Sequence, residues 1–299
     1  MPTDIQRSFA FNLDKRNGKA GCDSKRTVHI LCPFGKTWYK AALQRGPRSE
    51  AVYYQHGFED GRRREGAMLT MQCCGWRAAR AGLSHACTCY DLTNAFLCSP
   101  HEELDNTAWQ CFNPADAEMA IQRHRNAHVE MQLREGNLHM GLGSGSMMGD
   151  TIAPRMFNRT SERSTEEWLA QCQEEEGGKE CLASCPMVGQ SCDLSLTAFA
   201  DDMAKRVVDR DAMKLHGKVR RVSGLLDQAL SKRGYQQNRS KQETMVHAVG
   251  KGSVQASRAF YTRAVSLPGK VLPSLRYLGG EDALQELHGP RAHFTFKSH

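Results

Sequence analysis

Long apolar runs are missing from this 299-residue sequence. Charged or polar residues interrupt every stretch before it reaches the roughly 18 to 20 apolar residues that a membrane-spanning helix requires. The segment Met1–Arg26 also lacks the apolar block of a secretory signal peptide. The sequence therefore predicts an intracellular protein, nuclear or cytoplasmic, that does not bind a membrane and is not secreted.

Zinc-binding motifs are missing as well, although the sequence contains 12 cysteines. The close pairs Cys73/Cys74, Cys87/Cys89 and Cys181/Cys185 have no matching second pair and no His-x3-His partner nearby. We therefore expect no zinc site. Without an export signal, the thiols are expected to be reduced rather than joined in disulfides.

The composition excludes collagen-like, disordered and disulfide-stapled proteins, because 40% of the residues are apolar and 24% are charged. The length allows one large domain or two smaller ones. Lys and Arg outnumber Asp and Glu by 40 to 33, a formal net charge of +7. Basic runs such as Arg62–Arg64 and Lys218–Arg221 are compatible with a polyanionic partner and equally with a solvated helix face.

Hydrophobic periodicity predicts a protein that combines helices and strands. Apolar residues recur near helical spacing in 64–81, which predicts a helix there. From residue 85 to about 256, short apolar runs alternate with longer polar helical segments, a pattern typical of layered folds that mix helices and strands. The strongly polar segment 159–190 is interpreted as an insertion.

The segment Leu194–Val208 predicts a β-hairpin with Asp201 and Asp202 at its tip. Adjacent acids depart from the Asn-Gly or Asp-Gly pair that a tight hairpin favours, and two neighbouring carboxylates repel unless a cation lies between them. Successive side chains of a strand point to opposite faces, so one metal site there needs a further acid. Asp91, at the end of a short apolar run, is the best candidate.

These acids also have an ordinary structural explanation. Asp91 would then cap a helix, and Asp201 and Asp202 would lie in a solvated turn. The 110 residues between Asp91 and Asp201 mean that only the fold brings them together.

The tetrapeptide Phe199–Asp202 resembles the (Tyr/Phe)-x-Asp-Asp box of reverse transcriptases. Four more segments resemble boxes of that family in the family's order: Tyr90–Phe96, Met148–Phe157, Arg233–Met245 and Leu275–Gly279. The last is similar to the Lys-Tyr-Leu-Gly signature of non-LTR, LINE-like retrotransposons. Upstream, Gln55–Arg64 resembles the Gln-x-Gly-Phe segment of the fingers, and the likeness spans roughly residues 28 to 280.

The resemblance implies an α+β right-hand polymerase with fingers and palm, the palm being an antiparallel sheet with helices packed on one face. It places partial fingers at 1–84, the palm at 85–256, and the end of the palm with a short tail at 257–299, without a thumb. The implied activity is that of an RNA-directed DNA polymerase, a nucleotidyltransferase in which a primer 3′-hydroxyl attacks the α-phosphate of a nucleotide. Its cofactors would be two Mg²⁺ ions, with Mn²⁺ as a substitute. Its partners would be an RNA template, a DNA primer and deoxynucleoside triphosphates.

Matched position by position, the resemblance makes Asp91 and Asp201 the principal metal ligands and Asp202 an assisting one. Lys241 corresponds to the lysine that protonates or neutralises the pyrophosphate leaving group. The implied nucleotide-binding residues are Arg62, Asn94, Ala95, Phe96, Met148 and Gly149.

Two of these nucleotide-binding residues carry a specific expectation. Phe96 matches the bulky residue that selects against a ribose 2′-hydroxyl, and Gly149 matches a glycine that permits close backbone approach. Taken alone, Phe96 also fits a core aromatic, Gly149 a turn glycine and Lys241 a solvated surface charge.

Some positions depart from the family pattern. Met148 stands where the family has Gln and Thr151 where it has Pro, and the segment after Phe157 is more polar than a buried helix face favours. These departures favour a second hypothesis, a catalytically impaired nucleic-acid-binding remnant of a retroelement polymerase, that is, a degenerate or truncated copy. A third hypothesis is a protein-interaction scaffold, because a fold does not fix a function.

Overall fold

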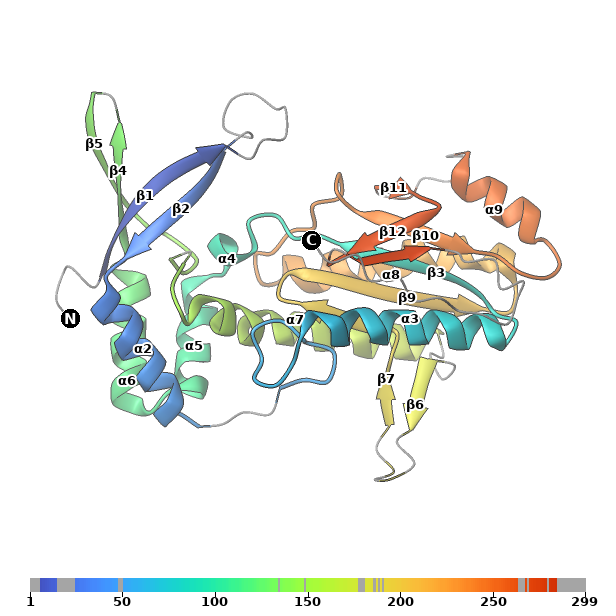
Figure 1. Ribbon diagram of the computed structural model, residues 1–299, viewed down its shortest axis with the longest axis horizontal. Coiled ribbons are helices and arrows are strands. Elements are labelled where there is room, and N and C mark those ends of the chain that lie inside the picture. The colour runs from blue at the N-terminus through green and yellow to red at the C-terminus, as the bar shows by residue number, and fades with distance from the viewer. Residues whose placement is uncertain are drawn as a thin grey trace. The chain divides into compact units, whose positions relative to one another are not determined.

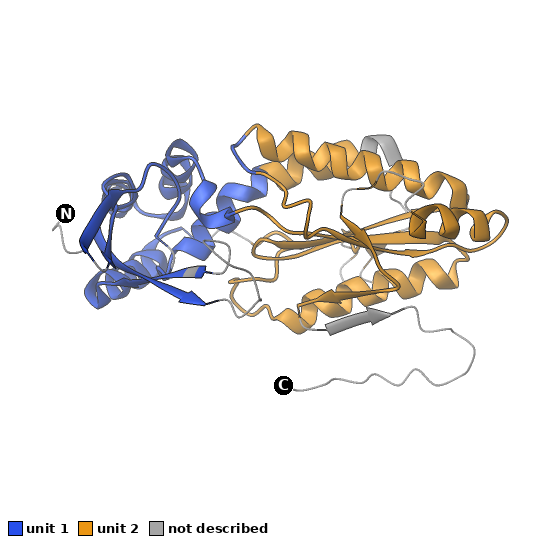
Figure 2. Ribbon diagram, turned by 90° about the horizontal axis from the view of Figure 1, so that it is seen from above, with its two compact units in different colours: residues 1–50, 94–163, 233–235 blue, residues 51–93, 164–232, 236–299 orange. Residues whose placement is uncertain are grey.

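The computed structural model describes residues 6–14, 25–47, 51–133, 135–147, 149–176, 181–184, 187, 189, 191–262, 267, 269–278 and 280–283. The chain divides into two compact units, each built from segments that are far apart in the sequence (Figure 2). Unit 1 comprises 1–50, 94–163 and 233–235, and unit 2 comprises 51–93, 164–232 and 236–299. Among the described residues, no helix is both long enough and apolar enough to span a membrane.

Unit 1 contains a four-stranded sheet and several helices (Figure 1). The strands, in spatial order, are β2 (Lys25–Leu31), β1 (Arg7–Asp14), β4 (His128–Leu133) and β5 (Gly136–Gly141). The β1–β4 pair is parallel and the other two pairs are antiparallel. The helices are α2 (Pro33–Arg45), α4 (Ala95–Cys98), α5 (His101–Cys111), α6 (Pro114–Arg125) and the first part of α7 (Ala153–Glu176).

Helices α2, α5, α6 and α7 of unit 1 share one apolar core. Proline occupies the first turn of α2 and of α6, where its missing N–H has no intrahelical acceptor to lose. Helices α5 and α6 are in contact, and both contribute small buried residues to this core, such as Ala108 and Ala117. Tyr39, Leu104 and Met156 fill the space around them.

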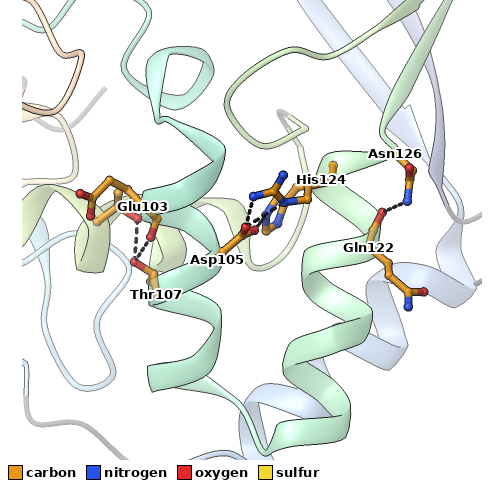
Figure 3. Close-up of polar contacts among 8 residues, drawn as sticks. Glu103, Asp105, Thr107, Gln122, His124 and Asn126 are labelled. Atoms are coloured by element: carbon orange, nitrogen blue, oxygen red, sulfur yellow. Dashed lines mark hydrogen bonds and ion pairs between the residues drawn. The ribbon is translucent and has the colours of Figure 1, made fainter.

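Polar contacts on α5 and α6 fix this helix pair (Figure 3). Oδ1 of Asp105 on α5 lies 2.6 Å from Nε2 of His124 on α6. Within the helices, the Thr107 hydroxyl donates to the carbonyl oxygen of Glu103, and the Asn126 amide donates to that of Gln122 (Figure 3). These bonds satisfy polar groups that would otherwise compete with the helical backbone.

Unit 2 is built around a five-stranded sheet (Figure 1). Its strands, in spatial order, are β11 (Lys270–Val271), β10 (Glu243–His247), β3 (Ser84–Tyr90), β9 (Asp202–Asp209) and β8 (Leu196–Phe199). Only the β10–β11 pair is parallel among these described strands. Two small two-stranded sheets pair β6 (Leu182–Ser184) with β7 (Ser191–Asp193) and β12 (Ser274–Tyr277) with β13 (Gly280–Ala283). The helices of unit 2 are α3 (Arg64–Arg80), η3 (Ala212–Lys214), α8 (Leu215–Ser231), α9 (Ser253–Tyr261) and the second part of α7.

Helices cover both faces of the five-stranded sheet (Figure 2). Met71 of α3 packs against the face that carries Cys87, whereas Ser223 of α8 bonds to Tyr90 on the opposite face of the same strand, O to O 3.1 Å. The expectation of helices on one face is therefore wrong. The physical reason lies in β3 and β9. Successive residues of these strands are buried, so both faces of the sheet need a layer that covers them.

The polar segment after Phe157 is helical and largely buried, which corrects the expectation that it is too polar for a buried helix face. The Thr160 hydroxyl donates to the carbonyl oxygen of Met156 at 2.7 Å and lies 3.1 Å from the hydroxyl of Thr107. The Ser161 hydroxyl likewise donates to a carbonyl oxygen one turn earlier. Small hydroxyl side chains can therefore be buried here, because the helix itself supplies their acceptors.

Candidate active site

Asp91 and the Asp201–Asp202 pair meet at one end of two neighbouring strands of unit 2. Asp91 directly follows β3, which lies beside β9 (Figure 1). The two strands pair in an antiparallel register that sets Tyr90 opposite Met203. The next pair in this register joins the residue after Tyr90 to the residue before Met203, and so brings Asp91 alongside Asp202. Residues separated by 110 positions in the sequence thus contribute carboxylates to one edge of the sheet.

The predicted hairpin with acids at its tip is confirmed. Strands β8 and β9 pair up to Phe199 opposite Asp202, which leaves Ala200 and Asp201 as the two-residue connection. Ala200 has φ +58°, a left-handed conformation that a tight hairpin normally assigns to glycine. A non-glycine residue in this region is strained, and such strain persists only where the surroundings hold it in place.

The electrostatics of the tip disfavour negative charge. Burial raises the pKa of Asp201, and the neighbouring charge of Asp91 raises it further. The pKa of Asp202 is raised to about 6, first by loss of hydration and then by the charges of Asp201 and Asp91. Lys241 acts in the opposite direction on both acids. A cation near the three carboxylates would offset the part of this rise that comes from repulsion between them.

The loop that carries Lys241 is fastened to the residues that follow β3. The Asn238 N–H donates to the carbonyl oxygen of Asp91 at 2.7 Å, and the Thr93 N–H donates to that of Gln236 at 2.9 Å. Lys241 itself donates to the Asn238 carbonyl and extends Nζ to within 3.0 Å of Oδ2 of Asp91. The structure therefore brings together Asp91, Asp201, Asp202 and Lys241, four of the predicted site residues.

The donor atoms at this edge suit a hard cation. Asp91, Asp201 and Asp202 offer only carboxylate oxygens, the ligands that magnesium prefers. Across the part of the chain that the structure describes, no cluster of three or more His, Cys, Asp or Glu side chains is arranged to hold a metal ion. Magnesium is usually bound by one or two carboxylates, with waters and substrate phosphates completing its shell. Asp91, Asp201 and Asp202 thus do not form a closed metal cage, and binding of Mg²⁺ by one or two of them stays a prediction.

The predicted nucleotide-binding residues Asn94, Ala95, Phe96 and Gly149 belong to unit 1. Phe96 is half-buried and packs on Phe157 with ring centroids 4.9 Å apart. Ala95 is buried, while Asn94 is exposed with φ +48°. Gly149 has φ +86°, and a Cβ there would lie 3.0 Å from the carbonyl oxygen of His29. Their contact with a nucleotide stays a prediction.

Met148 lies outside the described residues. Arg62, by contrast, has clear partners: Nη2 donates to the carbonyl oxygen of Ala51 at 2.9 Å, and Nη1 donates to those of Val52, Tyr53 and Gln55. This guanidinium therefore holds the preceding loop together. A contact between Nη1 of Arg62 and a nucleotide would compete with these backbone bonds.

Sequence reasoning missed two residues that support the hairpin tip. The buried Tyr277 hydroxyl donates to the carbonyl oxygen of Asp202 at 3.1 Å and also lies 3.3 Å from that of Thr197. The buried Gln55 amide bonds to the backbone of Ala200. Both residues lie in segments that resemble family boxes, but the resemblance assigned no role to either side chain.

No protein-family model matches the sequence, and no curated protein matches it. The fold, however, is similar to that of solved telomerase structures. Telomerase from Candida tropicalis in complex with a TWJ fragment of telomeric RNA aligns with a TM-score of 0.53 and 10% identity, over 83% of this chain and 42% of that chain. Apo telomerase from Candida tropicalis, truncated from its C-terminal domain, aligns with a TM-score of 0.52 and 9% identity, over 94% and 54%.

Telomerase from Candida albicans in complex with a TWJ fragment of telomeric RNA gives a TM-score of 0.53 and 10% identity, over 94% of this chain and 45% of that chain. The chain thus spans about half the length of these neighbours. At such identities the similarity shows the fold alone. The protein therefore shares its overall fold, with antiparallel-rich sheets and helices, with these telomerase structures.

Proposed function

We propose that this protein is an RNA-directed DNA polymerase of the non-LTR retroelement type, in which unit 2 supplies the palm. It adds deoxynucleotides to the 3′-hydroxyl of a DNA primer on an RNA template. The observation that carries the proposal is the convergence of Asp91 with Asp201 and Asp202 at one strand end, beside Lys241. The telomerase-like fold supports it independently of the acids.

In the proposed reaction the acids and Lys241 have different roles. Asp91 and Asp201 would hold Mg²⁺, and Asp202 would assist from the neighbouring position on β9. When bound, two such ions supply charge stabilisation for the attacking and leaving oxygens. Lys241, whose side chain is 65% exposed, is able to turn from Asp91 toward a leaving pyrophosphate and give it a proton.

A second function, nucleic-acid binding without catalysis, is favoured by one specific contact. The Lys241 ammonium already neutralises the Asp91 carboxylate at 3.0 Å, so a metal ion competes with the protein's own cation for this ligand. Binding to phosphates would survive the loss of metal chemistry, because it depends on Lys and Arg side chains spread over the surface.

Primer extension tests the proposal. Wild-type protein, Asp91→Asn and Asp201→Asn are given an RNA template, a DNA primer, deoxynucleotides and Mg²⁺. Asp209→Asn is the matched control, because Asp209 terminates the other end of β9 and pairs there with Lys218 at 2.9 Å. We expect extension by the wild type and the control, and a loss of about a hundredfold or more in the two site variants.

The other outcomes discriminate between the functions. Equal extension by wild type and Asp201→Asn would refute the role of Asp201. Salt-dependent RNA binding without extension by any of the proteins would favour the non-catalytic function. Failure to bind RNA or DNA at low salt would favour a protein-interaction scaffold.

A further inference from the structure

The side chain of Gln55 clamps the tip of the acidic hairpin. It is 5% exposed, and both the oxygen and the nitrogen of its amide make hydrogen bonds. Oε1 accepts hydrogen bonds from the N–H groups of Gly57 and Ala200, both at 2.9 Å. Nε2 donates to the carbonyl oxygen of Ala200 at 3.3 Å. One side chain therefore binds both the donor and the acceptor of the strained residue that precedes Asp201.

The backbone around Gln55 reinforces this clamp. The Ala198 N–H donates to the carbonyl oxygen of Tyr54 at 2.8 Å, and the His56 N–H donates to that of Ala198 at 2.8 Å. Gln55 and Ala198 thus form a parallel bridge along β8, which is the last strand in the order of the five-stranded sheet. The segment 54–57 extends the sheet past β8 and supports the hairpin from that side.

Gly57 allows this close approach. A Cβ built on Gly57 would collide with the backbone nitrogen of Ala200 and would lie 2.8 Å from the carbonyl carbon of Phe199. No side chain fits between the two backbones at this point. The absence of a side chain at Gly57 is therefore what places the Gln55 amide within reach of Ala200.

We propose that Gln55 is a positioning residue, which fixes the direction of the Asp201 carboxylate by holding Ala200 in its left-handed conformation. The inference rests on the proposed function for its catalytic consequence. Ala200 has no glycine-like freedom, so without the clamp the turn relaxes toward conformations with negative φ. Rotation of the Ala200–Asp201 peptide would move the carboxylate away from the ions that Asp91 shares.

Two substitutions separate the chemistry of the amide from its length. Gln55→Met keeps the length and removes all three side-chain hydrogen bonds. Gln55→Asn keeps the amide and shortens its reach by one methylene. The matched control is Ser84→Ala, because the buried Ser84 hydroxyl makes a similar two-way contact, accepting from the Val249 N–H at 3.0 Å and facing its carbonyl oxygen at 3.2 Å, at the opposite end of β3.

The measurements are kcat, KM for the nucleotide, the Mg²⁺ concentration that gives half-maximal rate, and the unfolding temperature. We expect both Gln55 variants to lower kcat by about tenfold to a hundredfold and to require more Mg²⁺, with a smaller change in KM. Ser84→Ala should lower the unfolding temperature to a similar degree without changing the Mg²⁺ requirement. If the Gln55 variants alter only the unfolding temperature, the positioning role is wrong.

Amide hydrogen exchange distinguishes failure of this inference from failure of the proposed function. In the wild type without Mg²⁺, the Ala200 N–H should be protected by Oε1 of Gln55. Faster exchange at residues 200–201 in both Gln55 variants, and not in Ser84→Ala, supports the clamp even if the wild type extends no primer. Unchanged exchange at these residues overturns the clamp, whatever the activity of the wild type.

Discussion

Nζ of Lys241 lies 3.0 Å from Oδ2 of Asp91, so the carboxylate at the end of β3 has a cation supplied by the loop before β10. The lysine side chain is 65% exposed and that of Asp91 is 24% exposed. An exposed ion pair contributes only about 0 to 1 kcal/mol, so it is readily exchanged for another partner. The proposed function requires this exchange, because Lys241 would leave Asp91 for a phosphate of the substrate.

Replacing Lys241 should change both the rate and its pH dependence. Lys241 lowers the pKa values of Asp201 and Asp202, so Lys241→Gln should raise them. The proposed function assigns the acid limb of the kcat profile to ionisation of these carboxylates, so that limb should move to higher pH. At its optimum the variant should still lose about 10²-fold to 10⁴-fold in kcat, the range expected for loss of a general acid.

Lys218→Gln is the control for this prediction, because Lys218 pairs with Asp209 at the other end of β9. It should leave the acid limb in place. A Lys241→Gln profile identical to that of the wild type would exclude Lys241 from the site.

Asp202 should make the protein less stable as the pH rises. Its pKa is about 6 in the folded protein and near 3.8 ordinarily, so between these values the folded state binds more protons than the unfolded state. Stability then falls as the pH increases from about 4 to 6, and the full penalty is present above pH 6. In urea denaturation without Mg²⁺, Asp202→Asn should be more stable than the wild type at pH 7 and should lose this advantage near pH 4.

Asp209 offers a control of opposite sign. Although burial acts against it, hydrogen bonds from the Asp211 backbone and Lys218 hold the pKa of Asp209 below its ordinary value. Asp209→Asn should therefore reduce stability at pH 7 and have little effect at low pH. If the two variants respond to pH in the same direction, the charge environment described for the hairpin tip is wrong.

Arg62 should affect activity by stabilising the loop that precedes it, and not by binding the nucleotide. Its guanidinium serves four backbone carbonyls between Ala51 and Gln55, and Arg62→Ala removes all of these donors. We expect a loss of about 1 to 3 kcal/mol in unfolding free energy, because the half-buried acceptors are left without partners. Since the same loop carries Gln55, kcat should fall while KM for the nucleotide stays near its wild-type value.

Arg63→Ala is the comparison, because Arg63 is exposed at the start of α3. It should have little effect on stability. A large increase in nucleotide KM for Arg62→Ala, at unchanged stability, would instead support the contact that the sequence predicted.

Short-range sequence patterns predicted those parts of the site whose structure depends on residues close together in the chain. Alternating apolar residues and a doubled acid identified the hairpin around Asp201, and a short apolar run identified the strand that ends before Asp91. The clamp by Gln55 could not be predicted in this way, because its partner Ala200 is 145 residues away. No periodicity encodes a side chain that bonds to so distant a backbone.

Counting polar residues one by one also gave a wrong expectation for the burial of α7. Buried positions recur every three or four residues along this helix and include Thr160 and Ser164. A hydropathy pattern treats each hydroxyl as a cost of burial, whereas the Thr160 hydroxyl finds an acceptor one turn earlier in its own helix. The expectation that this segment is too polar for a buried helix face followed from that assumption.

Breaking the buried ion pair between Asp150 and Arg123 should destabilise unit 1 strongly. Nη1 of Arg123 lies 2.8 Å from Oδ2 of Asp150, their side chains are 3% and 5% exposed, and the guanidinium lies over the ring of Tyr39. Burial raises the pKa of Asp150, and the charge of Arg123 opposes that rise. Asp150→Asn leaves the arginine charge buried without its counter-ion, which should cost about 3 to 5 kcal/mol of unfolding free energy.

A double-mutant cycle tests the assignment of that cost. If the penalty comes from the unpaired charge, then Arg123→Met combined with Asp150→Asn should be more stable than Asp150→Asn alone, because the second substitution removes the uncompensated guanidinium. The pair of Arg45 with Asp116, 3.0 Å apart in the same unit, supplies the comparison, since the Arg45 side chain is 54% exposed. Asp116→Asn should cost only about 0 to 1 kcal/mol, because water solvates the arginine that remains. Equal losses for Asp150→Asn and Asp116→Asn would show that burial does not govern the strength of these pairs.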